Sequence, residues 1–137
     1  MEGSLSGGRR SPSIERHAGE VHVGEEYAGD DFYCDVAIPH VSQLQVEHDD
    51  EWVLAFHHTR PFWANHIVVV PKKHIPSLTS VTAEDEEWMR RLFVVVQTLA
   101  GVLERRDGAA SVLTNLGQFQ DSKHLHVHIH DGRRLRD

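Results

Sequence analysis

A segment near the end of the chain, KHLHVHIHDG, alternates histidine with apolar residues. Its histidines are His124, His126, His128 and His130, and the residues between them are Leu125, Val127 and Ile129. A β-strand turns successive side chains to opposite faces. The segment is therefore predicted to be a strand with an apolar face and a face of imidazoles.

Three interpretations of the imidazole row are open. It could be the polar face of a structural strand, although four alternating histidines are an unusual way to solvate a sheet. It could belong to a zinc site, with further ligands from His66, Cys34 or an acidic side chain, because zinc takes three or four N, S or O ligands. It could also be a phosphate site, because a neutral imidazole can attack phosphorus while neighbouring imidazoles donate hydrogen bonds to the phosphate oxygens.

The composition restricts the partners of the chain. Its 137 residues leave room for one domain, and 39% hydrophobic and 26% charged residues are usual for a globular protein. A net charge of −7 disfavours nucleic acid and membrane surfaces as partners, so an anionic ligand would need a local positive pocket. No apolar run approaches the roughly 18–20 residues of a membrane span, and we expect no signal peptide. The single cysteine, Cys34, excludes an internal disulfide and favours a cytoplasmic location.

The chain is expected to have one domain after a polar arm. Residues 1–29 are rich in Gly, Ser and charge and are interpreted as a flexible arm, and residues 30–137 as the domain. A short helix is predicted within Asp30–His40, and strands at Ser42–His48, Glu51–His58, Ala64–Pro71, Ala109–Asn115 and the histidine segment. Several antiparallel strands with one long helix indicate an α+β fold.

The long helix is predicted to run from Thr82 to about Arg106. Thr82 with Asp85 three positions later forms a weak capping box, and Asp107-Gly108 ends the pattern. An apolar stripe that we expect to pack on the core consists of Met89, Leu92, Phe93, Val96, Ala100 and Leu103.

Three motifs in order resemble the histidine triad family. The triad itself reads His-x-His-x-His with apolar spacers, from His124 to His128. Upstream, LAFHHTRPFWANHIVVVPKKHI resembles the block in which a strand and a loop lead to Pro-Lys-Lys-His, and TNLGQFQDSK supplies an asparagine and a glutamine before the triad. The resemblance runs from about Cys34 to Arg133.

The resemblance implies a fold with a five-stranded antiparallel sheet, one long helix and a short N-terminal helix, which forms a two-fold dimer in the larger branch of the family. It also implies attack on the α-phosphate of a nucleoside monophosphate derivative, a nucleotidyl-histidine intermediate and hydrolysis by water. By position, His126 matches the nucleophile, and His124 and His128 would orient it and contact phosphate. His66 matches a histidine that lines the phosphate pocket.

Further candidate substrate-binding residues follow from the same resemblance. Asn115 and Gln120 match residues that bond the ribose–phosphate region. After His57, where family members often have an aspartate that bonds the ribose hydroxyls, this chain has His58. Three residues before the triad, where Ser or Thr often serves the leaving group, it has Asp121, followed by Ser122. Asp121 could act as an acid or favour a cationic amine leaving group.

Two further departures concern metal and substrate. Family members with structural zinc use two cysteines near the start of the domain, whereas this chain has Asp31 and Cys34, so we expect no metal and no other cofactor. Arg133, Arg134 and Arg136 could favour an anionic substrate tail, but a solvated chain end is the simpler interpretation.

The sequence therefore predicts a histidine triad hydrolase of the phosphoramidase type, a homodimer that acts on a purine nucleoside monophosphate derivative. The alternatives are a dinucleoside polyphosphate hydrolase, a nucleotidyltransferase, and a nucleotide- or metal-binding protein with little turnover.

Overall fold

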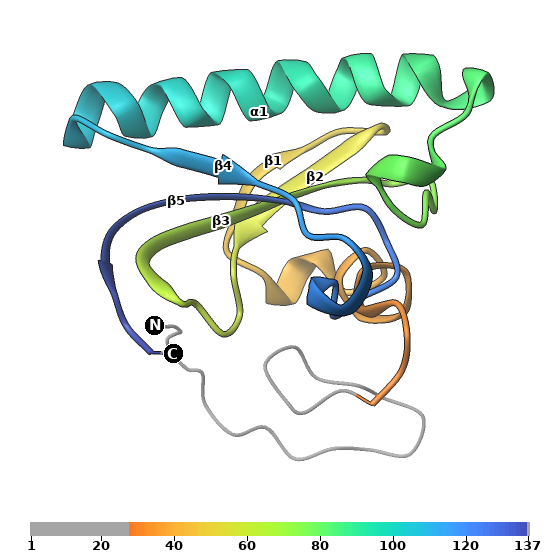
Figure 1. Ribbon diagram of the computed structural model, residues 1–137, viewed down its shortest axis with the longest axis horizontal. Helices are drawn as coiled ribbons and strands as arrows, with labels where there is room; N and C mark the ends of the chain where they lie inside the picture. Colours follow the sequence, from red (N-terminus) through yellow and green to blue (C-terminus); the bar gives the residue numbers. More distant parts are fainter. Residues whose placement is uncertain (1–27, 137) are drawn as a thin grey trace.

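The computed structural model describes residues 28–136 of the chain (Figure 1). Five strands form one antiparallel sheet in the order β1-β2-β3-β5-β4. Their bounds are Val46–Asp49 (β1), Val53–His57 (β2), Trp63–Pro71 (β3), Ser111–Leu113 (β4) and Val127–Arg134 (β5). The expected α+β fold with a five-stranded antiparallel sheet and one long helix is confirmed.

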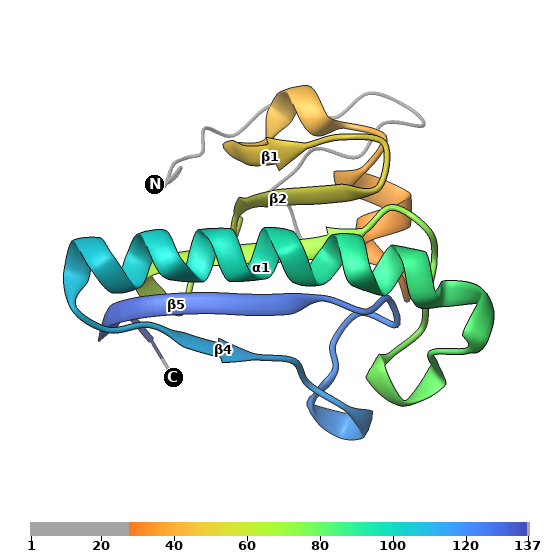
Figure 2. The same cartoon turned by 90° about the horizontal axis from the view of Figure 1, so that it is seen from above.

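The alternation of side chains along the central strands creates two apolar layers. Val53, Ala55, Ile67, Val69 and Ile129 pack against the long helix α1 (Glu86–Asp107). Leu54, Phe56, Val68 and Val70 pack on the other face, against the short helix η1 (Tyr33–Ala37). Figures 1 and 2 show α1 along one face of the sheet, over β3 and β5, with η1 on the opposite side. The central strands β2 and β3 are therefore buried on both faces, whereas the outer strands β1 and β4 are largely exposed.

Four of the five strands are shorter than the sequence patterns indicate, whereas β3 begins one residue before the predicted Ala64. The first part of the predicted strand Ser42–His48 is a 3-10 turn, η2 (Val41–Gln43). β5 begins at Val127 because the backbone just before it bonds to loops rather than to a strand: the N–H of Lys123 donates to Asp30 and that of Leu125 to Ile75. The remaining short turns are η3 (Leu78–Ser80), η4 (Ala83–Asp85) and η5 (Gly117–Phe119).

The start of the long helix follows the predicted cap. The backbone N–H of Thr82 donates to the Asp85 carboxylate at 2.9 Å, and η4 leads directly into α1. Gly108 ends the helix at φ 86°, in the left-handed region that glycine adopts without strain.

One predicted core residue of the helix was wrong. Phe93 is 64% exposed, whereas Leu92, Val95 and Leu103 are buried. Successive helical residues are rotated by about 100°, so Phe93 turns away from the sheet when Leu92 faces it. The buried stripe runs through Val95 instead.

The predicted arm, residues 1–29, lies almost wholly outside the described residues, so its flexibility and the boundary at residue 30 stay predictions. Among the helices of residues 28–136, none has the length and apolar character needed to cross a bilayer.

Candidate active site

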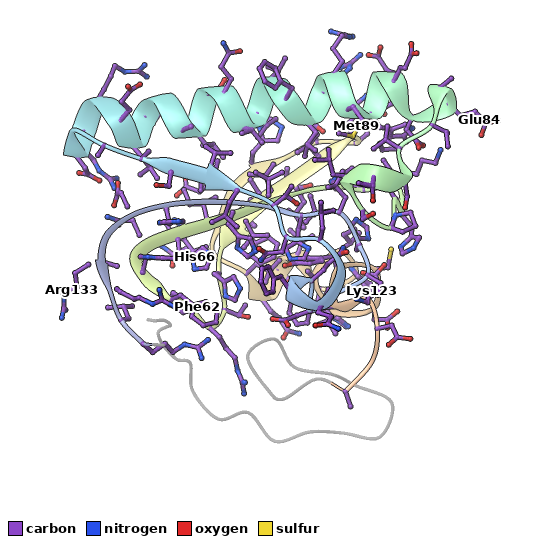
Figure 3. All side chains as sticks on the ribbon, viewed as in Figure 1. Phe62, His66, Glu84, Met89, Lys123 and Arg133 are labelled. Atoms are coloured by element: carbon purple, nitrogen blue, oxygen red, sulfur yellow. The ribbon has the colours of Figure 1, made fainter. Side chains whose placement is uncertain are left out.

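A cavity of about 540 Å³ lies on the face of the sheet away from α1. His126 and His128 reach it from the β5 segment, His66 from β3, and His58 from the loop after β2. Figure 3 shows His66 and Phe62 on this side of the sheet, whereas Met89 lies at the helix on the opposite side. Strand pairing thus brings together histidines that are far apart in the sequence.

His126 has a defined proton position. Its Nδ1 lies 2.7 Å from the carbonyl oxygen of His124, which can only accept, so Nδ1 carries a proton and donates it. The carbonyl of His126 accepts from the Thr114 hydroxyl at 2.7 Å, which holds the backbone in place. Burial lowers the pKa of His126 below its ordinary value, so the neutral form is favoured. The neutral ring then has its lone pair on Nε2.

His128 has the opposite arrangement, because a chain of two hydrogen bonds sets its tautomer. The backbone N–H of Phe62 donates to Nδ1 of His66 at 3.1 Å, so the neutral His66 carries its proton on Nε2. That nitrogen donates to Nδ1 of His128 at 2.8 Å, which leaves the proton of His128 on its own Nε2. Burial lowers the pKa of His66, and burial with the neighbouring imidazoles lowers the pKa of His128 to about 4. Both rings are therefore neutral at pH 7.

His58 adds another neutral donor. Its Nδ1 accepts from the backbone N–H of Arg60 at 2.9 Å, so its proton lies on Nε2. Burial, followed by the nearby imidazoles and arginines, lowers its pKa to about 3. One ring nitrogen from each of His58, His66 and His128 lies within 4.8 Å of the other two. The three bonds to Nδ1 put protons on the other ring nitrogens, and the Nε2–H of His66 is used by His128, so the Nε2–H groups of His58 and His128 are left as donors for a ligand.

The other expected site residues divide into two groups. Asn115, Asp121 and Ser122 line the cavity. Gln120 does not line it, because its amide donates to the carbonyl of Pro76 at 2.7 Å. His57 is also outside the lining and pairs with Glu47 at 2.6 Å.

His124 is turned away from the cavity into a second polar cluster. Its side chain is fully buried, with Nδ1 3.0 Å from the Asp31 carboxylate and Nε2 2.8 Å from the carbonyl of Pro71. The Sγ of Cys34 lies 3.4 Å from the same Nδ1, and Nδ1 of His74 lies 2.5 Å from Asp31. His124 therefore contacts the ring of His126 through its backbone carbonyl, whereas its own imidazole lies outside the cavity.

This second cluster has a donor set that suits zinc. One ligand atom from each of Asp31, Cys34, His74 and His124 lies within 4.8 Å of the others. Thiolate, imidazole and carboxylate are the ligands that tetrahedral zinc sites use. The sequence argument against zinc depended on a missing cysteine, and the structure places the carboxylate of Asp31 among the other three donors.

Some cavity residues were not anticipated from the sequence. The ring of Tyr33, in η1, lies 4.8 Å from that of His126. Arg60 lines the cavity together with Arg134 and Arg136 from the end of the chain. Tyr33 has no local pattern that distinguishes it from a core residue. Arg134 and Arg136 were named from the sequence as possible partners of an anionic substrate tail, although a solvated chain end was the simpler interpretation, whereas Arg60 was not singled out.

Comparison with known proteins places these residues in a family context. A family model described as the HIT domain matches residues 41–135. The purine nucleoside phosphoramidase of Escherichia coli K12 is 32% identical over 94 residues, which cover 66% of this chain and 77% of that protein. An uncharacterised HIT-like protein of Synechococcus elongatus is 32% identical over 91 residues, which cover 66% of this chain and 80% of that protein.

Solved structures agree with the fold. A HIT family hydrolase from Legionella pneumophila superposes with a TM-score of 0.66 at 25% identity, covering 77% of this chain and 96% of that one. A histidine triad protein from Clostridium difficile superposes with a TM-score of 0.64 at 30% identity, and the match covers 82% of this chain and 98% of that one.

Proposed function

The chain belongs to the HIT domain family, and we propose that it hydrolyses nucleoside 5′-monophosphate derivatives at the α-phosphate through a nucleotidyl-histidine intermediate. Its relatives include HIT family hydrolases and a phosphoramidase, which support a hydrolase that acts on a nucleotide-type substrate. The observation that carries the finer proposal is the proton on Nδ1 of His126, which leaves the lone pair on Nε2. The lone pairs of the other neutral cavity histidines, 58, 66 and 128, lie on Nδ1 and each accept a hydrogen bond.

In the first step, Nε2 of His126 forms a bond to the α-phosphorus, and the bond from phosphorus to the leaving group breaks. The positive charge that develops on the ring is stabilised by the carbonyl of His124, which accepts from Nδ1 at 2.7 Å. The leaving group takes the bonding electron pair and a proton from solvent. In the second step, the oxygen of water forms a bond to phosphorus and the bond from phosphorus to Nε2 breaks, which releases the nucleoside monophosphate, the neutral imidazole and one proton to solvent.

His128 would stabilise the charge on the phosphate oxygens. Its Nε2–H is set by the bonds through His66 to the backbone of Phe62, so it is oriented before the reaction begins. Preorganised donors of this kind lower the barrier because they need no rearrangement as charge develops.

The lining of the cavity supports a nucleotide with an amine leaving group. Phe32, Phe62, Trp63 and Phe119 provide aromatic surfaces for a purine, and the name of the E. coli relative supports that class of base. Asp121 and Ser122 lie in the same lining. An acidic group there would favour a cationic amine over a polyphosphate next to it, which favours a phosphoramidate over a dinucleoside polyphosphate.

The substitution His126→Ala tests the nucleophile. We would mix the full chain briefly with an adenosine 5′-phosphoramidate at neutral pH and record its intact mass. Wild type should gain the mass of one nucleoside monophosphate, and the variant should gain none while turnover falls at least about 10³-fold. Nucleotide binding should survive in the variant, because His126 is one of many lining groups.

Turnover that is unchanged in His126→Ala would refute the mechanism. Binding without any adduct or turnover in wild type would instead support the binding-protein alternative. Transfer of the nucleotidyl group to an added alcohol or phosphate in preference to water would identify a transferase.

We also propose that the chain forms a homodimer through the outer side of α1 and the edge strand β4. Phe93, Val94 and Val102 on α1 are 64%, 50% and 41% exposed, and Val112 on β4 is 51% exposed. Exposed apolar surface beside a free strand edge favours association with a second copy. Sedimentation should give twice the chain mass of 15.6 kDa for wild type. Phe93→Glu should shift it to the monomer, whereas Val46→Glu on the opposite edge strand should not.

Asp31, Cys34, His74 and His124 would hold a zinc ion, if one binds. Its contribution would be structural: it would link the segment around η1 to the loop after β3 and to the residues before β5.

A further inference from the structure

The cavity has a cationic end although the chain as a whole is acidic. Its lining contains three arginines, Arg60, Arg134 and Arg136, and one carboxylate, Asp121, in a chain of net charge −7. Within residues 28–136, none of the three guanidinium groups forms an ion pair with a carboxylate. Three cations that have no carboxylate partner among the described residues attract an anion to this cavity.

Backbone carbonyls and aromatic rings hold two of these arginines in place. The guanidinium of Arg136 donates to the carbonyls of Arg60 at 2.7 Å and Pro61 at 3.3 Å, and lies 3.9 Å from the centre of the Phe62 ring. Arg134 donates to the carbonyl of Arg136 at 2.9 Å. Because neutral partners position the guanidinium groups, their charge stays available to a ligand.

Arg134 is further supported by a stacked pair of rings. Its guanidinium lies 5.7 Å from the centre of the Trp63 ring. Trp63 in turn stacks on His130, with the ring centres 3.5 Å apart and the planes inclined by 6°. The backbone N–H of Leu135 donates to the carbonyl of Phe62 at 2.7 Å, which joins the end of β5 to the loop before β3.

His58 connects the cationic end to the phosphate donors. Its ring stacks on that of His66, with centres 4.4 Å apart, and lies 5.9 Å from that of His128. Its Nδ1 is occupied by the N–H of Arg60, so Nε2 is a donor without a negative charge. A carboxylate in this place would repel an anion, whereas the N–H of His58 can bind one.

The acidic residue of the lining acts on a different part of the site. Asp121 lies five residues before His126, in the segment that leads to β5, whereas Arg136 donates to the carbonyls of Arg60 and Pro61 in the loop before β3. The carboxylate and the arginines therefore come from different segments of the cavity lining.

We propose that the substrate carries a second phosphate, beyond the one that His126 attacks, and that His58, Arg60, Arg134 and Arg136 bind it. This inference rests on the proposed function and narrows its substrate class. The second phosphate has two chemical sources: a phosphate ester on a ribose hydroxyl, or the next phosphate of a polyphosphate chain. Both present negatively charged phosphate oxygens to the guanidinium groups.

Equilibrium binding tests the subsite without turnover. We would measure by calorimetry the binding of four ligands to the full chain: adenosine 5′-monophosphate, adenosine 2′,5′-bisphosphate, adenosine 3′,5′-bisphosphate and ADP. At least one ligand with a second phosphate should bind about 10-fold or more tightly than the monophosphate, because hydrogen bonds to charged groups are the stronger class. The advantage should decrease as salt is added.

Arginine variants identify the residues responsible. The double substitution Arg134→Gln and Arg136→Gln should reduce this affinity ratio to about 3-fold or less, because it weakens the ligand with the second phosphate more than the monophosphate. Arg133→Gln is the matched control, because Arg133 adjoins Arg134 in sequence but does not line the cavity. It should keep the full advantage.

The four ligands also distinguish the two sources. A gain with a bisphosphate assigns the second phosphate to the ribose, and a gain with ADP alone assigns it to the polyphosphate chain. Equal binding of all four ligands, or equal losses in the double variant and in Arg133→Gln, would overturn the subsite while the proposed hydrolase stands. If no nucleotide binds at all, both proposals fail.

Discussion

Replacement of His66 tests the hydrogen-bond chain that orients His128. His66→Leu keeps a buried side chain of similar size but removes both the acceptor for the Phe62 N–H, at 3.1 Å, and the donor to Nδ1 of His128, at 2.8 Å. The neutral His128 then has no partner that holds its proton on Nε2. In a fraction of the molecules the proton will lie on Nδ1, and Nε2 will face the phosphate as an acceptor.

The size of the effect follows from the loss of one preorganised donor, which costs about 10²–10³ in kcat. His66→Gln is the matched variant, because its amide can still donate to Nδ1 of His128. We expect kcat to fall about 10²-fold in His66→Leu and within about 10-fold in His66→Gln. The KM should change little in both, because the donor acts mainly on charge that develops in the transition state.

Steady-state hydrolysis of an adenosine 5′-phosphoramidate with a fluorescent amine gives these constants. Nitrogen chemical shifts of the histidine rings report the tautomer of His128 directly, and urea unfolding shows whether each variant is folded. Wild-type activity in His66→Leu, or equal losses in the Leu and Gln variants, would refute the argument. A His128 ring that keeps its proton on Nε2 in His66→Leu would do the same.

Two further predictions concern stability. Burial lowers the pKa of His128 to about 4 from an ordinary 6.5, so between these pH values the unfolded chain binds a proton that the folded chain does not. This histidine should therefore reduce the free energy of unfolding as pH falls from 6.5 to 4, by at most about 1.4 kcal/mol per pH unit. It should have no effect above pH 6.5. Urea unfolding across this range checks it, and an unaltered slope in His128→Gln would contradict it. Zinc added to the metal-free chain should stabilise it by about 2.7 kcal/mol when free zinc exceeds its Kd 100-fold. Thermal unfolding should lose this shift in His74→Ala, which removes one of the four donors, and a shift that persists there would place the metal elsewhere.

The fold could be predicted in large part because its signals are local. The alternation around Val127 and Ile129 identifies the face of β5 that packs against α1, and the pair Thr82 and Asp85 marks the start of the helix. These patterns depend on neighbours within a few positions. The same reasoning failed at Phe93. Leu92 and Phe93 are adjacent apolar residues, so the sequence pattern allows either of them to face the core, and only the contact of α1 with the sheet selects Leu92.

The site was predicted less completely than the fold. Sequence alone indicated that His66, His126 and His128 belong together, and the cavity contains all three. It did not indicate that the ring of His124 turns to Asp31, a residue 93 positions away, while its carbonyl serves His126.

Sequence by itself determined which residue types face each side of the sheet, because side-chain direction follows from backbone periodicity. Tertiary structure alone decided which ring nitrogen of His128 carries the proton. Its partner is His66, 62 positions earlier in the sequence, which is itself set by the backbone of Phe62. It also brought Arg60 beside Arg136, whose guanidinium bonds to a carbonyl 76 positions earlier. Hydrogen bonds and charges act through space, and a one-dimensional pattern contains no distances between residues so far apart.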